Sequence, residues 1–88
     1  MRIQVQKPTP DQLKALNIDA WSTWACPPSS FAWEYEGRET AYIFEGRVTV
    51  TTPFEEVSIG KGDLVVFPKG LKCKWTVHEA VRKVYKFD

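Results

Sequence analysis

Hydrophobic and polar positions alternate along most of this chain, in short stretches that turn residues separate. The clearest stretch is Arg47–Thr52, where Val48 and Val50 occupy every second position and therefore share one face of a strand. Leu64–Phe67 is a continuous apolar run, which is typical of a strand buried on both faces. Glycine and proline lie between many of these stretches, as is usual at turns. We therefore predict short strands over Arg2–Lys7, Trp21–Cys26, Phe31–Tyr35, Thr40–Glu45, Arg47–Thr52, Glu56–Ile59, Leu64–Phe67, Lys72–His78 and Val81–Phe87.

One short helix is predicted before most of the strands. In Thr9–Gln12 a threonine can cap the helix, a proline takes the first helical position, and a glutamine can complete a capping box. Leu13 and Leu16 give this helix one apolar side, and Asn17 is expected to end it. Many short strands with a single short helix predict an all-β fold, either a barrel or a sandwich.

The composition is that of a folded protein with a small core. The 88 residues are 43% hydrophobic and 26% charged, which is typical of globular chains. Compact domains contain roughly 50 to 200 residues, so we expect one domain over residues 1–88. A chain of this length buries only about 60–65% of its unfolded surface. Association of two copies would bury more, and we therefore expect a homodimer.

Charge and hydropathy exclude several classes of partner. The chain has 12 Lys and Arg against 11 Asp and Glu, a net charge of +1, without a block of like charge. We therefore expect no nucleic-acid partner and no binding to an anionic membrane. No apolar run approaches the length of a membrane-spanning helix, about 20 residues, and the first residues do not resemble a signal peptide. A cytoplasmic protein is expected, with Cys26 and Cys73 as free thiols.

Two segments have the residue spacing of known motifs. In the first, Glu39 is followed seven positions later by Gly46, and in the second Gly62 precedes Pro68 and Gly70 at fixed spacing. These positions resemble the end of the first cupin motif and the beginning of the second. The 15 residues that separate Gly46 from Gly62 also suit the hairpin between the motifs of small cupins.

Four strings narrow this resemblance to one group of cupins. Trp33–Tyr35, Tyr42–Gly46, Gly62–Gly70 and Cys73–Trp75 resemble small stand-alone cupins related to the modules of (S)-ureidoglycine aminohydrolase and the ethanolamine-utilisation cupins. The resemblance implies an all-β, cupin (RmlC-like) jelly-roll β-barrel with one short N-terminal helix. It also implies a dimer in many members.

The metal-binding positions of the cupin motifs carry unusual residues in this chain. Metal-binding cupins hold one divalent ion with two histidines and a glutamate of the first motif and a histidine of the second. By position, these are Trp33, Tyr35, Glu39 and Cys73 here. Tryptophan has no lone pair to offer, and neutral tyrosine is a poor ligand. The only histidine, His78, has the opposite side-chain parity to Cys73 and is expected to face outward. We predict no resident metal and no cofactor.

Alternation also predicts which side chains fill the barrel. Residues two apart on a strand share a face, and the cupin resemblance implies that the faces of Trp33, Glu39 and Cys73 look inward. The result would be a pocket with aromatic walls, one carboxyl group and one thiol, which is the usual character of a ligand site. We predict ligand contacts from Trp33, Tyr35, Ile43, Trp75 and Lys83, and catalytic roles for Glu39, Cys73 and Tyr35.

The roles of three of these residues stay open at this point. Glu39, desolvated by aromatic rings, would suit a general acid or base, or it would tie strands together by accepting hydrogen bonds from Tyr35 or a backbone amide. Cys73 would be a nucleophile only beside a base or a positive charge, and otherwise it is a small core residue. The facing of Lys83 is undecided. If it points inward, it would neutralise Glu39 and leave a pair able to hold a zwitterionic ligand.

Three functions follow from these observations. The first is a small cupin that binds a small organic molecule in an aromatic-lined pocket, either as a binding module or as a metal-independent enzyme. The second is a metal-dependent enzyme similar to ureidoglycine aminohydrolase, acting on a ureido or amino acid, against which the missing histidines argue. The third is a non-catalytic structural or regulatory partner protein.

Overall fold

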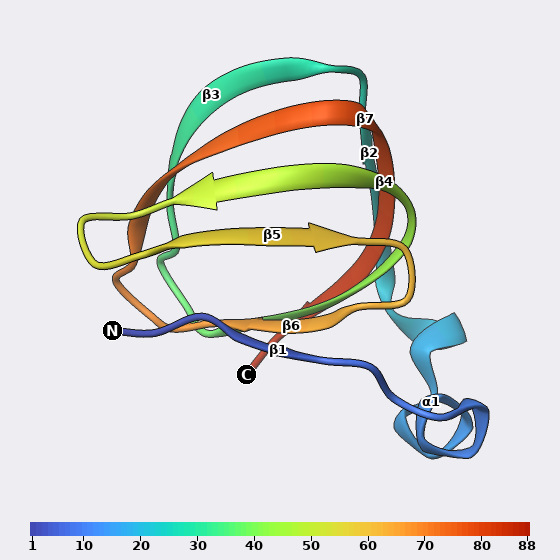
Figure 1. Cartoon of the computed structure of the whole chain (residues 1–88). Helices are drawn as coiled ribbons and strands as arrows, with labels where there is room; N and C mark the ends of the chain where they lie inside the picture. Colours follow the sequence, from blue (N-terminus) through green and yellow to red (C-terminus); the bar gives the residue numbers. More distant parts are fainter.

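Seven antiparallel strands curve around a hydrophobic interior and form the predicted all-β jelly roll (Figure 1). The structure is a computed structural model that describes residues 1–88. The strands are hydrogen-bonded in the order β1-β6-β4-β7-β2, with β3 also paired to β7 and β5 to β4. The elements are β1 (Gln4–Gln6), α1 (Pro10–Leu16), the 3-10 turn η1 (Ile18–Ala20), β2 (Ser22–Cys26), β3 (Ser29–Glu34), β4 (Glu39–Thr51), β5 (Glu56–Gly60), β6 (Leu64–Phe67) and β7 (Lys72–Phe87).

Two long strands form the middle of the sheet. β4 pairs with β5, β6 and β7, whereas β7 pairs with β2, β3 and β4. The sequence predicted each of them as two separate strands, and this was wrong. The register between β4 and β7 shifts at Ile43, Glu45 and Arg47, so the strands bulge and continue without a break. Because bulges add local twist, each long strand can serve both halves of the barrel.

Gly46 allows β4 and β7 to approach closely at this bulge. Its φ of 106° lies in the left-handed region, which L-residues with a side chain rarely adopt. A Cβ atom at this position would lie 2.5 Å from the carbonyl oxygen of Ala80 and 2.6 Å from the Cα of Val81. Both neighbours are backbone atoms, which cannot move aside as a flexible side chain can. The bend therefore requires glycine for two independent reasons.

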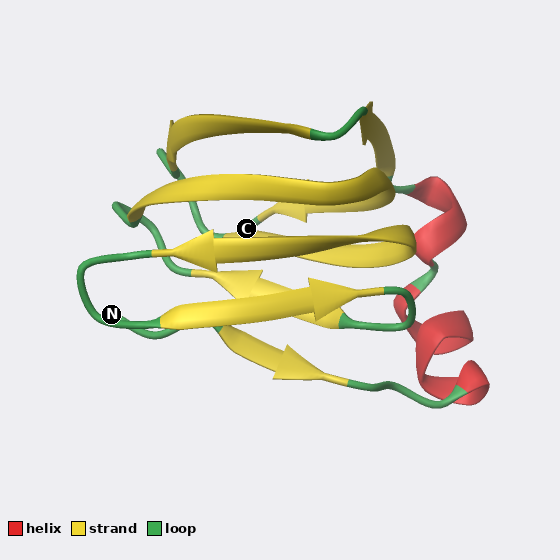
Figure 2. Cartoon of the chain, turned by 45° about the horizontal axis from the view of Figure 1, so that its top comes forward, coloured by secondary structure: helices red, strands yellow, loops and turns green.

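The helix has the predicted ends and lies outside the barrel. Thr9 and Gln12 form the complete capping box, and Asn17 ends the helix with left-handed dihedral angles. None of the residues of α1 is buried, and the helix lies beyond one end of the strands (Figures 1 and 2). The turn η1 was not predicted. It buries Ile18 and leads the chain back to the sheet. No helix has the length and hydropathy that crossing a membrane requires.

Aromatic rings make up one part of the core. Trp75 is central, with ring-centroid distances of 5.9 Å to Trp24, 6.0 Å to Phe31 and 5.9 Å to Phe67. Tyr35 stacks on Phe67 at 4.5 Å. Such pairs contribute about 0.5–1.5 kcal/mol each beyond the area they bury. The cluster joins residues from β2, β3, β6 and β7 and fixes the shape of this side of the barrel.

We expect Gly46→Ala to destabilise the protein much more than Gly62→Ala. Both glycines have positive φ angles, but a Cβ at Gly62 would meet nothing within 4 Å. The control should therefore lose only the conformational term, about 1–2 kcal/mol, whereas Gly46→Ala adds a backbone clash and should lose about 3 kcal/mol or more. Urea unfolding followed by tryptophan fluorescence measures both values. Equal losses would contradict the close approach of β4 and β7.

Candidate functional site

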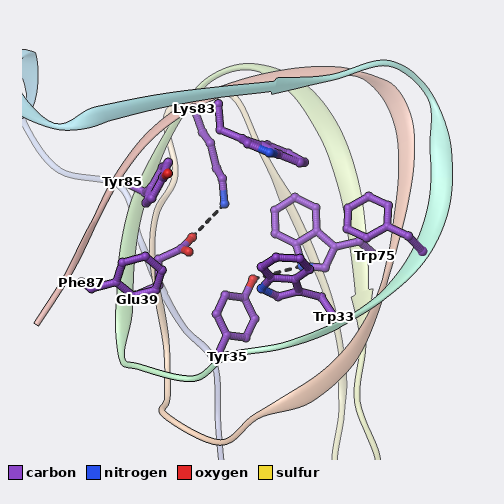
Figure 3. Close-up of a pocket in the computed structure, with 9 residues that line it drawn as sticks. Trp33, Tyr35, Glu39, Trp75, Lys83, Tyr85 and Phe87 are labelled. Carbon is purple, nitrogen blue, oxygen red and sulfur yellow. Dashed lines mark hydrogen bonds and ion pairs between the residues drawn. The ribbon is translucent and has the colours of Figure 1, made fainter.

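A cavity of about 250 Å³ opens between the aromatic cluster and the central strands (Figure 3). Seven of the nine side chains that line it are aromatic, and the remaining two, Glu39 and Lys83, carry opposite charges. We call it the aromatic cavity. Its lining consists of Trp24, Phe31, Trp33, Tyr35, Glu39, Trp75, Lys83, Tyr85 and Phe87.

Strand register brings these side chains to one place. Trp24 on β2 lies opposite Lys83 on β7, and Phe31 on β3 lies opposite Trp75 on β7. Glu39, at the start of β4, lies opposite Phe87 near the end of β7. Directly opposed residues of an antiparallel pair point to the same face. The cavity is thus built where three strands each place one inward face against β7.

The two charged side chains form a buried ion pair. The ammonium nitrogen Nζ of Lys83 donates a hydrogen bond to Oε2 of Glu39 at 2.8 Å, and the two side chains are 7% and 5% exposed. Figure 3 shows them pointing toward each other across the cavity. The facing of Lys83, which the sequence left undecided, is inward. Its neighbour Arg82 faces outward and pairs with Glu45 at the surface.

Aromatic rings surround the ammonium group. Nζ of Lys83 lies 4.8 Å from the ring centroid of Trp75, 5.0 Å from that of Trp24, 5.4 Å from that of Tyr85 and 6.0 Å from that of Phe67. Ring faces attract a cation by about 0.5–1 kcal/mol at exposed sites and by about 2 kcal/mol or more when water is excluded. Burial nevertheless lowers the pKa of Lys83 below its ordinary value, and the charge and hydrogen bond of Glu39 oppose this shift only in part. Loss of the lysine proton is therefore easier here than in water.

Tyr35 presents a protonated hydroxyl group to the same cavity. Its oxygen accepts a hydrogen bond from the indole N–H of Trp75 at 3.1 Å. Burial raises the pKa of Tyr35 well above its ordinary value, and the negative charge of Glu39 raises it further. The phenol therefore keeps its proton at neutral pH, and it can donate a hydrogen bond to an oxygen atom of a ligand.

Cys73 and Ile43 are buried beside the cavity but do not line it. Cys73 lies opposite Trp33 on β3, and Ile43 lies opposite Lys83 on β7. Burial raises the pKa of the Cys73 thiol to about 11, and the charge of Glu39 adds to this effect. A thiol with this pKa is almost entirely protonated at neutral pH, which favours its interpretation as a core residue over that of a nucleophile.

Most of the predicted site residues therefore meet in one place. Trp33, Tyr35, Glu39, Trp75 and Lys83 line the cavity together, with Trp33 52% exposed at its opening. Of the partners that the sequence offered for Glu39, the structure shows the ammonium group of Lys83, and no hydrogen bond joins Glu39 to Tyr35. Four further lining residues were not named from the sequence: Trp24, Phe31, Tyr85 and Phe87.

Parity along the strands could have identified one of these four, since Phe31 has the same parity as Trp33. Tyr85 and Phe87 have the same parity as Lys83, whose facing the sequence left undecided. Once one residue of a face is known to point inward, its neighbours two positions away follow. Trp24 had no such signal, because no motif residue on β2 fixed which of its faces looks inward.

The residues present do not fit the divalent ion that the cupin motifs imply. Of the four ligand positions, Trp33 has no group that can become anionic, burial raises the pKa values of Tyr35 and Cys73 so that both keep their protons at neutral pH, and the carboxylate of Glu39 is already paired with an ammonium group. A second cation at this carboxylate would be repelled by Lys83. No group of three or more His, Cys, Asp and Glu side chains comes together that could hold a metal. His78 lies on the outside and is hydrogen-bonded to Thr49 at 2.8 Å.

We expect the ion pair to behave as a unit when it is mutated. Lys83→Met alone leaves Glu39 buried without its partner and should lower the free energy of unfolding by about 3–5 kcal/mol. The double variant Glu39→Gln/Lys83→Met removes both charges and should recover most of this loss. Chemical denaturation of the wild type, the single variants Lys83→Met and Glu39→Gln, and the double variant measures the coupling. A double variant that is as unstable as the sum of the single variants would contradict it.

The raised pKa of Cys73 predicts slow alkylation with a steep dependence on pH. In a Cys26→Ser variant, Cys73 is the only thiol, since the chain has two cysteines. With a pKa of about 11, the rate with iodoacetamide should rise about tenfold per pH unit between pH 7 and 9.5, because only the thiolate reacts. The same protein in urea supplies the fast reference. A rate that levels off by pH 8 in the folded protein would argue against this environment.

The chain resembles known proteins along its whole length. Residues 13–85 match the EutQ-like cupin domain. A DUF861 family protein from Thermotoga maritima is 48% identical and covers 99% of this chain and 100% of that chain, with a TM-score of 0.97. A comparison with curated proteins finds no match.

More distant structures share the barrel over part of their length. The EutQ protein of Clostridium difficile is 25% identical with a TM-score of 0.66. The match covers 72% of this chain and 50% of that chain, so the present chain corresponds to about half of it. A putative ethanolamine utilization protein EutQ from Salmonella typhimurium is 21% identical with a TM-score of 0.62, which shows a common fold alone. It covers 97% of this chain and 68% of that one. The match over residues 13–85 and the close relative from Thermotoga maritima agree, and this chain belongs to the EutQ-like cupin domain family.

Proposed function

We propose that this cupin binds one small organic molecule in the aromatic cavity. The apolar part of the ligand would lie between the rings near Trp33 and Trp75, and a polar group would reach the Glu39–Lys83 pair. The observation that carries the proposal is the composition of the lining, in which seven aromatic side chains surround two charged ones. Ligand pockets have this character, with mostly apolar walls and a few polar groups that fix orientation.

The dimensions of the cavity limit the ligand. An apolar cavity of roughly 150 Å³ holds one benzene molecule, so about 250 Å³ suits a molecule a little larger than one ring. Three groups offer hydrogen bonds: the carboxylate of Glu39, the ammonium of Lys83 and the phenol of Tyr35. Two of these are donors, which favours a ligand whose polar group contains an accepting oxygen.

The other two functions predicted from the sequence have less support. A metal-dependent aminohydrolase would need ligands that the four motif positions do not supply, as the pairing of Glu39 shows. A purely structural role would not explain why the buried pair is charged, because hydrophobic residues in the same positions would serve that role equally well. The homodimer and the cytoplasmic location expected from the sequence are also part of this proposal.

The proposal predicts that Trp33→Ala weakens ligand binding without unfolding the barrel. The control is Phe54→Ala, because Phe54 is 66% exposed and does not line the cavity. A library of one-ring and short aliphatic compounds would be screened against the wild type by ligand-observed NMR. For compounds that bind, removal of an indole from the cavity should reduce affinity at least tenfold, or about 1.4 kcal/mol, with no change in Phe54→Ala. The proposal is wrong if no compound binds the wild type, or if both variants bind equally well.

A further inference from the structure

Lys83 differs from every other lysine of the chain. The other seven are exposed, whereas Lys83 is buried and ends inside the aromatic cavity. Its ammonium group has one hydrogen-bond partner, the carboxylate of Glu39, and is otherwise surrounded by rings. A structural ion pair needs neither a cavity beside it nor a nitrogen atom that borders the cavity.

We infer that the nitrogen of Lys83 is a nucleophile that forms a Schiff base with a small aldehyde or ketone held in the aromatic cavity. The inference rests on the proposed function and names its ligand class. A desolvated lysine in an apolar pocket is the usual form of a nucleophilic amine. The lowered pKa of Lys83 agrees with this role, since only the neutral amine has a free electron pair.

The charge of the cavity favours a neutral ligand. Glu39 and Lys83 compensate each other, so a charged ligand would leave one of the three charges unpaired among aromatic rings, at considerable cost. A carbonyl compound is neutral, and its oxygen accepts hydrogen bonds, which the phenol of Tyr35 can supply. Its apolar substituent would lie against the rings. Aldehydes and ketones therefore satisfy the lining better than acids or amines do.

Glu39 is placed to handle every proton of the reaction. The ammonium group of Lys83 gives one proton to Oε2 of Glu39, 2.8 Å away, and becomes an amine. The amine attacks the carbonyl carbon, a C–N bond forms, and the C=O π electrons move to the oxygen. That oxygen gains one proton and the nitrogen loses one, with Glu39 as the carrier, giving a neutral carbinolamine.

Dehydration completes the sequence without any further reactant. The protonated Glu39 gives its proton to the hydroxyl group, the C–O bond breaks, and water leaves while the nitrogen electron pair forms the C=N bond. The balance is one ammonium group plus one carbonyl compound giving one iminium ion and one water. The iminium keeps the positive charge at the same nitrogen, so the carboxylate and the rings of Trp24 and Trp75 stabilise it as they stabilise the ammonium group.

Reductive trapping tests the inference directly. The folded protein is incubated at neutral pH with benzaldehyde and sodium cyanoborohydride, which reduces the iminium to a stable benzyl amine, and peptide mass spectrometry locates the label. We expect labelling at Lys83 at least tenfold faster than at any exposed lysine. Lys86→Met is the matched control on the same strand, since Lys86 is exposed. In this variant Lys83 should be labelled at the wild-type rate.

Two variants separate the roles of the pair. Lys83→Arg keeps a positive charge but cannot form a Schiff base, and it should lose the fast label. If it does not fold, the uncharged double variant Glu39→Gln/Lys83→Met serves the same purpose. Glu39→Gln keeps the lysine but removes the proton carrier. It should slow the labelling of Lys83 by about tenfold or more and change its dependence on pH, whereas Lys86→Met changes neither.

Benzyl alcohol, which has the same ring but no carbonyl group, distinguishes the two proposals. If NMR shows that benzaldehyde and benzyl alcohol bind in the cavity while Lys83 is not labelled faster than exposed lysines, the Schiff-base inference is wrong and the binding function stands. If neither these probes nor any compound of the screen binds, the proposed function itself is wrong. Fast labelling that persists in Glu39→Gln with an unchanged pH profile would overturn the role of Glu39.

Discussion

The buried ion pair between Glu39 and Lys83 is the interaction on which the interior of this barrel depends. Moving an ammonium group and a carboxylate out of water costs several kcal/mol for each ion. The structure offsets this cost by placing them 2.8 Å apart and by surrounding the nitrogen with aromatic rings. One partner comes from β4 and the other from β7, the two central strands. The pair therefore links the electrostatics of the cavity to the register of the sheet.

The site residues that could be predicted lie on strands where a cupin motif residue fixed which face points inward. Alternation of side chains along the strand then gave the other inward positions. The cupin motif placed Glu39 inward, and period-two spacing then carried the neighbouring positions with it, including Trp75 on its own strand once Cys73 was aligned. The last predicted strand, Val81–Phe87, contains no motif residue, and its inward face could not be assigned in this way. Its two faces both carry a cation, Lys83 on one and Arg82 on the other. The apolar residues Val81, Tyr85 and Phe87 share the face of Lys83, but a lysine on that face argued against its burial. The deciding partner, Glu39, lies 44 positions away.

The bends of the long strands were hidden from the sequence for a related reason. A glycine such as Gly46 looks the same in a sequence whether it ends a strand or permits a bulge. What distinguishes the two cases here is the backbone of Ala80 and Val81, which lies against the glycine after the sheet has formed. Helix ends behave differently, because the capping residues Thr9 and Gln12 contact each other within four positions. The helix ends could therefore be predicted from the sequence, whereas the bulge between β4 and β7 could not.

The site also differs in kind from a metal centre at the same place in a barrel. A metal ion binds and leaves, whereas the cation of this cavity is covalently attached to β7 and its position is fixed by strand register. Its charge, moreover, depends on one proton. Transfer of that proton over 2.8 Å would convert the pair from two ions into an amine and a carboxylic acid. Because burial already lowers the pKa of Lys83, a ligand that excludes more water would favour this neutral form further. Binding of an apolar molecule and activation of the nitrogen are then one physical event.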